Sequence, residues 1–91
     1  MTHTTTVTLP PAEVLKRAEA FFAERIPHAA AFVEQSGPRF VVLRGQGGEE
    51  VVFSAWEDNG VTRVRASTLF FDQAVDRFFS TLPLASAVEV A

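Results

Sequence analysis

The sequence contains no cysteine and no apolar run that approaches the ~20 residues of a membrane-spanning helix. Without cysteine the chain forms no disulfide bond and has no thiolate chemistry. Its first residues, MTHTTTVTLPP, lack both the charged leader and the apolar stretch of a secretory signal. These absences predict a cytoplasmic protein with no membrane partner.

Residues typical of nucleic-acid, metal and catalytic sites are also scarce. The formal net charge is −3, whereas nucleic-acid binding usually requires a basic face. The only histidines are His3 and His28, and neither has further ligands at metal-binding spacing. No serine or threonine has a histidine placed to activate it, so we identify no catalytic residue and regard an enzyme as the least favoured class. We expect no nucleic acid, metal or cofactor.

What the sequence does contain is enough apolar material for one folded domain. Hydrophobic residues make up 47% of the 91 positions and charged residues 21%, values that argue against disorder. We expect a single α+β domain over residues 1–83 and a C-terminal tail over residues 84–91. The tail begins after Pro83 with small residues, and it is either loose or adds a short strand.

Two segments have the periodicity of amphipathic helices. The first is predicted over Pro11–Arg25, after a proline pair that suits a first helical turn, and Pro27 ends it. The second is predicted over Thr68–Leu82, where apolar residues recur as adjacent pairs four positions apart. This second stretch brings four phenylalanines, so it needs a broad apolar surface to pack against.

Five segments are predicted to be strands: Thr2–Leu9 at a sheet edge, Ala29–Gln35, Arg39–Arg44, Glu49–Glu57 and Val61–Ser67. The order β-α-β-β-β-β-α predicts a two-layer α+β sandwich, with an antiparallel sheet and both helices on one face. The TBP-like fold has this order of elements, and helix-grip domains have it with insertions.

Turn signals between the strands predict which residues face each other. A two-residue turn at Asn59-Gly60 places Trp56 opposite Arg63 and Ser54 opposite Arg65. The glycines from Gly45 to Gly48 lack the lysine of a phosphate loop and predict a hairpin loop.

The remaining two turns complete the predicted register. A four-residue hairpin loop at Gly45–Gly48 places Arg44 opposite Glu49 and Val41 opposite Val52. A tight turn at Ser36-Gly37 places Glu34 opposite Arg39, as a weak surface pair.

These registers sort the strand residues into two faces, because side chains alternate along a strand. The face expected beneath the helices carries Val33, Phe40, Val42, Val51, Phe53, Ala55, Val64 and Ala66. The second face is expected to carry Phe32, Glu34, Arg39, Val41, Leu43, Val52, Ser54, Trp56, Arg63 and Arg65. The second face is too apolar to be plain solvent surface, and a chain this short has no element left to cover it.

Both ends of the chain resemble small SRPBCC/START-like domains of the polyketide-cyclase type. The resemblance rests on TVTLPPAEVLKRAEAFF (Thr6–Phe22) and on VTRVRAS followed by FFDQAVDRFFSTL. Members of that family curl a longer sheet around the C-terminal helix and enclose an apolar ligand. The present chain is shorter, so the resemblance implies no closed cavity within one subunit and no catalytic residues.

Two hypotheses follow for the second face. The preferred one is an interaction module that forms a homodimer; the alternative is a carrier of a small apolar or anionic ligand, with Arg39, Arg63 or Arg65 holding an acidic head group. Trp56 beside the two arginines of the last strand is either an anion-binding cluster or ordinary cross-strand packing. Asp72 and Asp76 are interpreted as a solvated helix face. The candidate residues are Phe32, Arg39, Val41, Leu43, Val52, Ser54, Trp56, Arg63 and Arg65.

Overall fold

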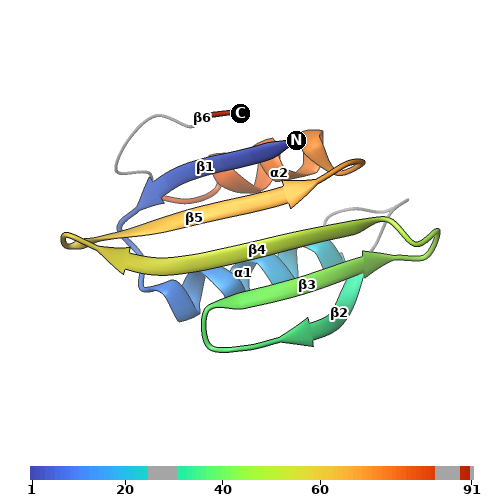
Figure 1. Ribbon diagram of the computed structural model, residues 1–91, viewed down its shortest axis with the longest axis horizontal. Helices are drawn as coiled ribbons and strands as arrows, with labels where there is room; N and C mark the ends of the chain where they lie inside the picture. The colour runs from blue at the N-terminus through green and yellow to red at the C-terminus, as the bar shows by residue number, and fades with distance from the viewer. Residues whose placement is uncertain (25–30, 84–88, 91) are drawn as a thin grey trace.

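Helices and strands follow the predicted order in the computed structural model, which describes residues 1–24, 31–83 and 89–90 (Figure 1). The elements are β1 (Thr2–Val7), α1 (Pro11–Glu24), β2 (Ala31–Ser36), β3 (Phe40–Gly45), β4 (Glu50–Asp58), β5 (Val61–Thr68), α2 (Asp72–Ser80) and β6 (Glu89–Val90). The α+β class is therefore confirmed. The predicted end of the first helix at Arg25 and Pro27, the histidine His28 and most of the tail lie outside the described residues.

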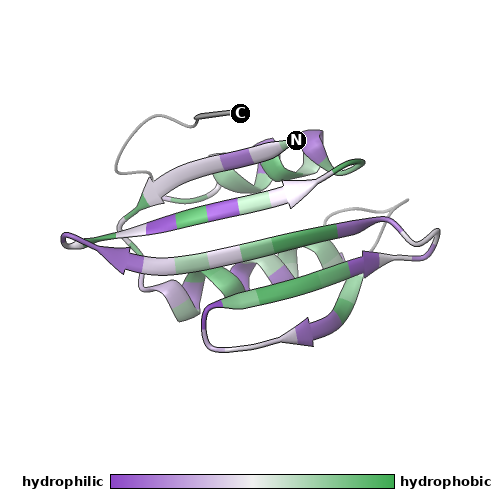
Figure 2. Cartoon of the chain, viewed as in Figure 1, coloured by the Kyte–Doolittle hydropathy of each residue, from purple (hydrophilic) through white to green (hydrophobic). Residues whose placement is uncertain are grey.

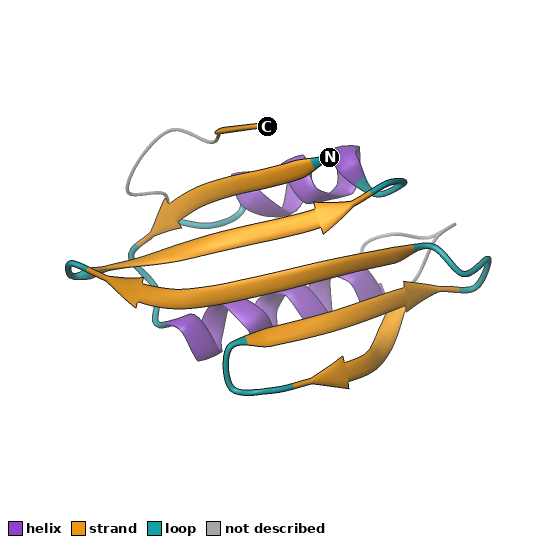
Figure 3. Ribbon diagram, in the orientation of Figure 1, coloured by secondary structure: helices purple, strands orange, loops and turns teal. Residues whose placement is uncertain are grey.

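One antiparallel sheet forms the front layer of the molecule, and both helices lie behind it (Figure 3). The strand order is β2-β3-β4-β5-β1-β6, which confirms the two-layer sandwich. β1 was expected at an edge, but the two-residue β6 pairs with His3 and Thr4 of β1. Of the two alternatives for the tail, a short strand is the one observed at Glu89–Val90.

The first helix forms where its sequence begins with proline and carries an apolar stripe. The Pro10 carbonyl accepts hydrogen bonds from the backbone N–H groups of Glu13 and Val14, at 3.1 and 3.2 Å, so the first turn is closed. The stripe packs on the sheet and is buried at Val14, Leu15, Ala18 and Phe22. α1 therefore packs on the sheet along the whole length of the helix.

An aromatic cluster joins both helices to the sheet. The Phe53 ring of β4 lies between Phe22 of α1 and Phe78 of α2, with edge-on contacts at centroid distances of 5.5 and 5.4 Å. Phe71 adds a perpendicular contact to Phe22 at 5.5 Å. Each ring brings a large apolar area, so this cluster is the main hydrophobic tie between the layers.

The second helix begins later than predicted, and this changes the position of one phenylalanine. Thr68 Oγ1 accepts hydrogen bonds from the backbone N–H groups of Phe70 and Phe71 and donates one to the carbonyl of Glu50 at 2.8 Å. These bonds hold a turn ahead of Asp72, so Phe71 is buried whereas Phe70 points outward. The expectation that Phe70 belongs to the buried helix stripe was wrong.

The hairpin between β4 and β5 has the predicted register. Asn59 and Gly60 both adopt positive φ, 53° and 83°, which is the geometry of the two-residue turn that matches strand twist. Trp56 lies opposite Arg63, and Ser54 lies opposite Arg65. The Asn-Gly signal is local, so it fixes this register without help from the rest of the fold.

The hairpin between β3 and β4 is shifted by one residue from the prediction. Arg44 pairs with Glu50 rather than Glu49, because the loop holds three residues between Gly45 and Glu49 and has Gly48 at φ 90°. A one-residue shift exchanges the faces of a strand. Val41 and Leu43 are consequently buried beneath the helices, while Phe40 and Val42 face the other side.

The outer strand β2 is interrupted by a register shift between Val33 and Gln35. Phe32 pairs with Arg44 and Val33 pairs with Leu43, so the predicted Glu34–Arg39 pairing is not formed. Val33 lies on the helix side of the sheet but remains 42% exposed, which contradicts its predicted burial. The bulge therefore leaves β2 as a twisted, largely exposed edge.

Replacing Val41 by Ala tests the observed register. Val41 is 1% exposed, so losing two buried methyl groups should lower the free energy of unfolding by about 2 kcal/mol. Val33→Ala is the matched control and should change it by less than about 0.5 kcal/mol. Urea denaturation measures both, and the opposite ranking would support the predicted register instead.

Candidate functional site

No described helix covers the sheet surface turned away from α1 and α2, here called the open face (Figure 1). Cross-strand pairing places Val42 beside Val52, Phe40 beside Ser54, and Trp56 beside Arg63. The face includes Phe32, Phe40, Val42, Arg44, Glu50, Val52, Ser54, Trp56, Asp58, Arg63, Arg65, Ser67, Thr2, Thr4 and Thr6. Its apolar members gather on β3 and β4, whereas β1 contributes threonines (Figure 2).

Most of the predicted candidate residues lie on this face. Six of them do, namely Phe32, Val52, Ser54, Trp56, Arg63 and Arg65. Arg39 is exposed just before β3. Val41 and Leu43 were wrongly placed and belong to the core, because the shorter hairpin loop turns them inward. Phe40 and Val42, which the prediction had buried, take their places and are half-buried.

Arg44 is the centre of a charged cluster at one end of the open face. Its guanidinium Nε donates to Glu34 Oε2 at 2.5 Å, and its Nη2 donates to Glu50 Oε2 at 2.8 Å. The hydrogen bond to Glu34 raises the pKa of Arg44, and Glu50 adds to that effect. The predicted partner of Glu34 was Arg39, which is a second consequence of the wrong turn lengths.

The two arginines of β5 differ in their surroundings. Arg63 Nε donates to Asp58 Oδ2 at 2.5 Å, so its charge is compensated within the hairpin. Arg65 is exposed and has no carboxylate within ion-pair distance among the residues that the structure describes. Of these two, Arg65 is therefore the cation available to an external anion.

A groove of about 390 Å³ lies at the end of the open face next to the loop between β5 and α2. It is lined by Met1, Thr2, Gly48, Glu50, Val52, Ser67, Thr68, Leu69 and Phe70. Leu69 and Phe70 are the most exposed large apolar side chains described, at 81% and 72%. Sequence reasoning missed this loop because it assigned Thr68–Leu82 to one continuous helix.

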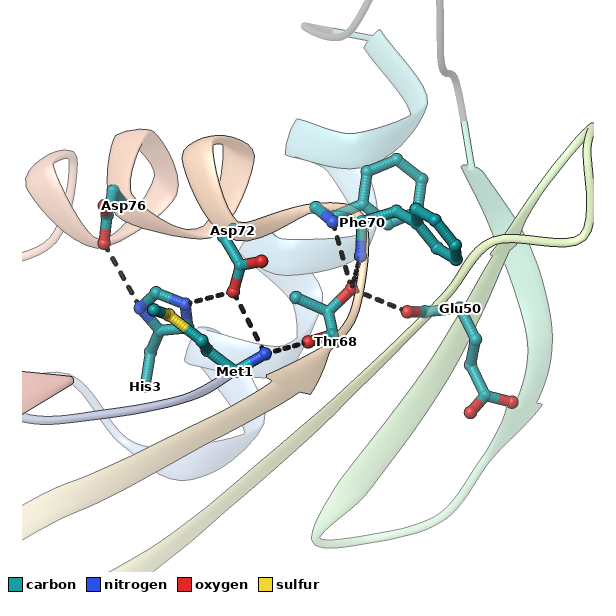
Figure 4. Close-up of polar contacts among 8 residues, drawn as sticks. Met1, His3, Glu50, Thr68, Phe70, Asp72 and Asp76 are labelled. Carbon is teal, nitrogen blue, oxygen red and sulfur yellow. Dashed lines mark hydrogen bonds and ion pairs between the residues drawn. The ribbon is translucent and has the colours of Figure 1, made fainter. Parts of the chain in front are cut away.

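A polar cluster on the opposite side of the sheet links β1 to α2 (Figure 4). The His3 side chain is 2% exposed, with Nε2 2.7 Å from Asp72 Oδ1 and Nδ1 3.3 Å from Asp76 Oδ1. The Met1 amine also lies 3.3 Å from Asp72 Oδ1 and donates to the Thr68 carbonyl. A buried imidazole between two carboxylates ties the first strand to the last helix.

Asp72 has a perturbed acidity as a result. The His3 hydrogen bond holds the pKa of Asp72 below its ordinary value of 3.8; the Met1 amine adds to that effect and desolvation partly opposes it. Asp72 and Asp76 were interpreted as a plain solvated face. The missed signal was the alternation of His3, Thr5 and Val7, which places the imidazole on the same side of the strand as Val7.

This cluster resembles a catalytic arrangement only in its residue types. His3 is almost wholly buried, so its ring does not reach solvent. Among the described residues, no group of three or more histidines, cysteines or acidic residues is arranged to hold a metal ion. The same part of the chain contains no helix long and apolar enough to span a bilayer. The cluster is best explained as a structural tie.

Comparisons with known proteins do not suggest a function, so a functional argument must start from the fold and the open face. No family model matches the chain, and neither the curated proteins nor the solved structures contain a match.

Replacing Asp72 by Asn tests the tie between β1 and α2. The pKa of Asp72 is lowered in the folded state. The ionised carboxylate therefore stabilises the folded state at pH values above its ordinary pKa. That contribution is lost as the pH falls through the lowered pKa. The variant should therefore be less stable than wild type at neutral pH, and the difference should shrink in acid.

Urea denaturation at a series of pH values measures this difference. Glu57→Gln is the control, since Glu57 is exposed and forms no ion pair among the described residues. If the difference in the free energy of unfolding between wild type and the Asp72 variant stays constant with pH, the expectation is contradicted.

Proposed function

We propose that this chain is an interaction module that forms a homodimer through its open face. The observation that carries the proposal is the half-buried apolar cluster of Phe40, Val42, Val52 and Trp56, which no described helix covers. Soluble monomers rarely expose a large contiguous apolar surface. A second copy of the chain removes this surface from water on both subunits at once.

The dimensions of the sheet support a dimer of ordinary size. The molecule measures 38 × 24 × 20 Å, and the sheet extends along the two longer directions (Figure 1). A molecule of this outline is large enough for its open face to contain the ~800 Å² that each partner buries in a standard interface. A smaller patch would support only a transient contact.

The charges on the face favour a second copy over a partner of opposite net charge. Arg44 is paired with Glu34 and Glu50, Arg63 is paired with Asp58, and Arg65 is a further cation on the same surface. A two-fold interface brings the same patch together from both subunits, so it needs both signs of charge within that patch. The open face meets this requirement.

Replacing Trp56 by Asp tests the dimer. Wild type should have the mass of a dimer by size exclusion with light scattering, and the variant should be monomeric because it loses the one tryptophan of the chain and adds a charge that the second copy would have to desolvate. Ala20→Asp is the control: it adds the same charge to an exposed position on α1 and should remain dimeric. A wild-type monomer at high concentration would overturn the proposal.

A carrier of a small acidic ligand is the second candidate. The observation that favours it is Arg65, an exposed cation on the open face with no ion pair in the described part of the chain. An apolar body would lie over Val42 and Val52 while its acidic head group reached Arg65. This candidate carries forward the resemblance to SRPBCC/START-like domains, whose members enclose apolar ligands.

Calorimetric titration with decanoate, as an apolar acid, tests the carrier. Arg65→Ala should weaken binding roughly 10- to 100-fold, the effect of losing a hydrogen bond to a charged group. Arg63→Ala should change it little, because Arg63 is already paired with Asp58. Equal affinity of wild type and the Arg65 variant would exclude the assigned role of Arg65.

A further inference from the structure

Leu69 and Phe70 are held outward by the fold on a fixed turn. The Thr68 hydroxyl binds the backbone N–H groups of Phe70 and Phe71 and the carbonyl of Glu50, so the turn is attached to β4. Phe71, the next residue, is buried and contacts the Phe22 ring. Because the backbone of this turn is already held in place, little backbone entropy is lost when its two apolar side chains bind, which suits them as anchors.

The groove beside this turn is continuous with the open face. Val52, Ser67 and Thr2 line the groove, and the same three residues form one cross-strand row of the face. An interface on the open face can therefore extend into the groove across this row, through Val52 and the small side chains of Ser67 and Thr2. Leu69 and Phe70 themselves form one wall of the groove.

The charge of the groove favours an apolar occupant. Among the described residues that line it, Glu50 is the only acidic one, and Arg44 already neutralises it at 2.8 Å. The Thr68 hydroxyl makes three hydrogen bonds and has no free donor. Its described lining contains no lysine, arginine or histidine side chain, and the amine of Met1 is already paired with Asp72 at 3.3 Å. An anionic head group or a nucleic acid finds no side-chain cation there.

We propose that Leu69 and Phe70 of one copy pack into this groove on the second copy, so that the two turns meet near the two-fold axis. The inference rests on the proposed homodimer and names the part of the surface that anchors it. A two-fold interface requires a patch that fits itself, and a groove with projecting apolar side chains in its wall supplies both parts of such a fit. A small molecule fits less well, because an open groove leaves much of its surface in water.

The absence of cysteine makes a direct test available. Leu69→Cys introduces the only thiol, and turns that meet across the axis bring two Cα atoms within the ~4.4–6.8 Å that a disulfide spans. Mild oxidation should then convert the dimer to a covalent dimer on non-reducing gels. Glu57→Cys is the control, because Glu57 lies near the opposite end of β4 and should not cross-link.

A second variant makes the test quantitative. Phe70→Ser should weaken dimerisation at least ten-fold by sedimentation, while the circular dichroism spectrum stays unchanged because Phe70 is exposed. If Trp56→Asp dissociates the dimer but Leu69→Cys does not cross-link and Phe70→Ser has no effect, the inference is overturned and the open-face dimer stands. A monomeric wild type would overturn both. Binding of decanoate that Phe70→Ser abolishes in a monomeric wild type would assign the groove to a small ligand instead.

Discussion

The contact of Phe53 with Phe22 and Phe78 is the interaction on which the remaining structure depends. One ring on a central strand holds both helices, so both are drawn to the same side of the sheet. A chain of this length has no third helix among its described residues to cover the other side. The exposure of Phe40, Val42, Val52 and Trp56 follows directly from the way the core is built.

The loop between β3 and β4 decides which residues occupy that exposed side. Val41, Val42 and Leu43 are all apolar, so hydrophobicity alone permits either face of β3 to point inward. The left-handed conformation of Gly48 selects a three-residue loop and thereby the inward position of Val41 and Leu43. The composition of the open face is thus set by a turn that does not itself lie on it.

Local signals were enough to predict the elements, their order and the Asn59-Gly60 hairpin. The Gly45–Gly48 loop could not be predicted in the same way, because several glycines permit several loop lengths. The contact of His3 with Asp72 joins residues 69 positions apart, and only the packing of α2 behind β1 brings them together. Phe70 was assigned to the helix because the helical pattern of apolar residues begins before Asp72. In the structure, hydrogen bonds to the Thr68 hydroxyl hold these first residues in a turn instead. The features that were predicted wrongly or missed depend on turn geometry and on contacts between residues far apart in the sequence.

The bulge in β2 has a consequence for aggregation. An edge strand with free N–H and C=O groups is a template onto which other chains can add, and repeated addition produces open-ended fibrils. Between Val33 and Gln35 the edge is kinked, and the Glu34 carboxylate bound to Arg44 sits at the kink. At the other side of the sheet, β6 occupies part of the edge of β1. Neither border offers a long, flat strand, so the sheet resists indefinite growth even though its open face is apolar.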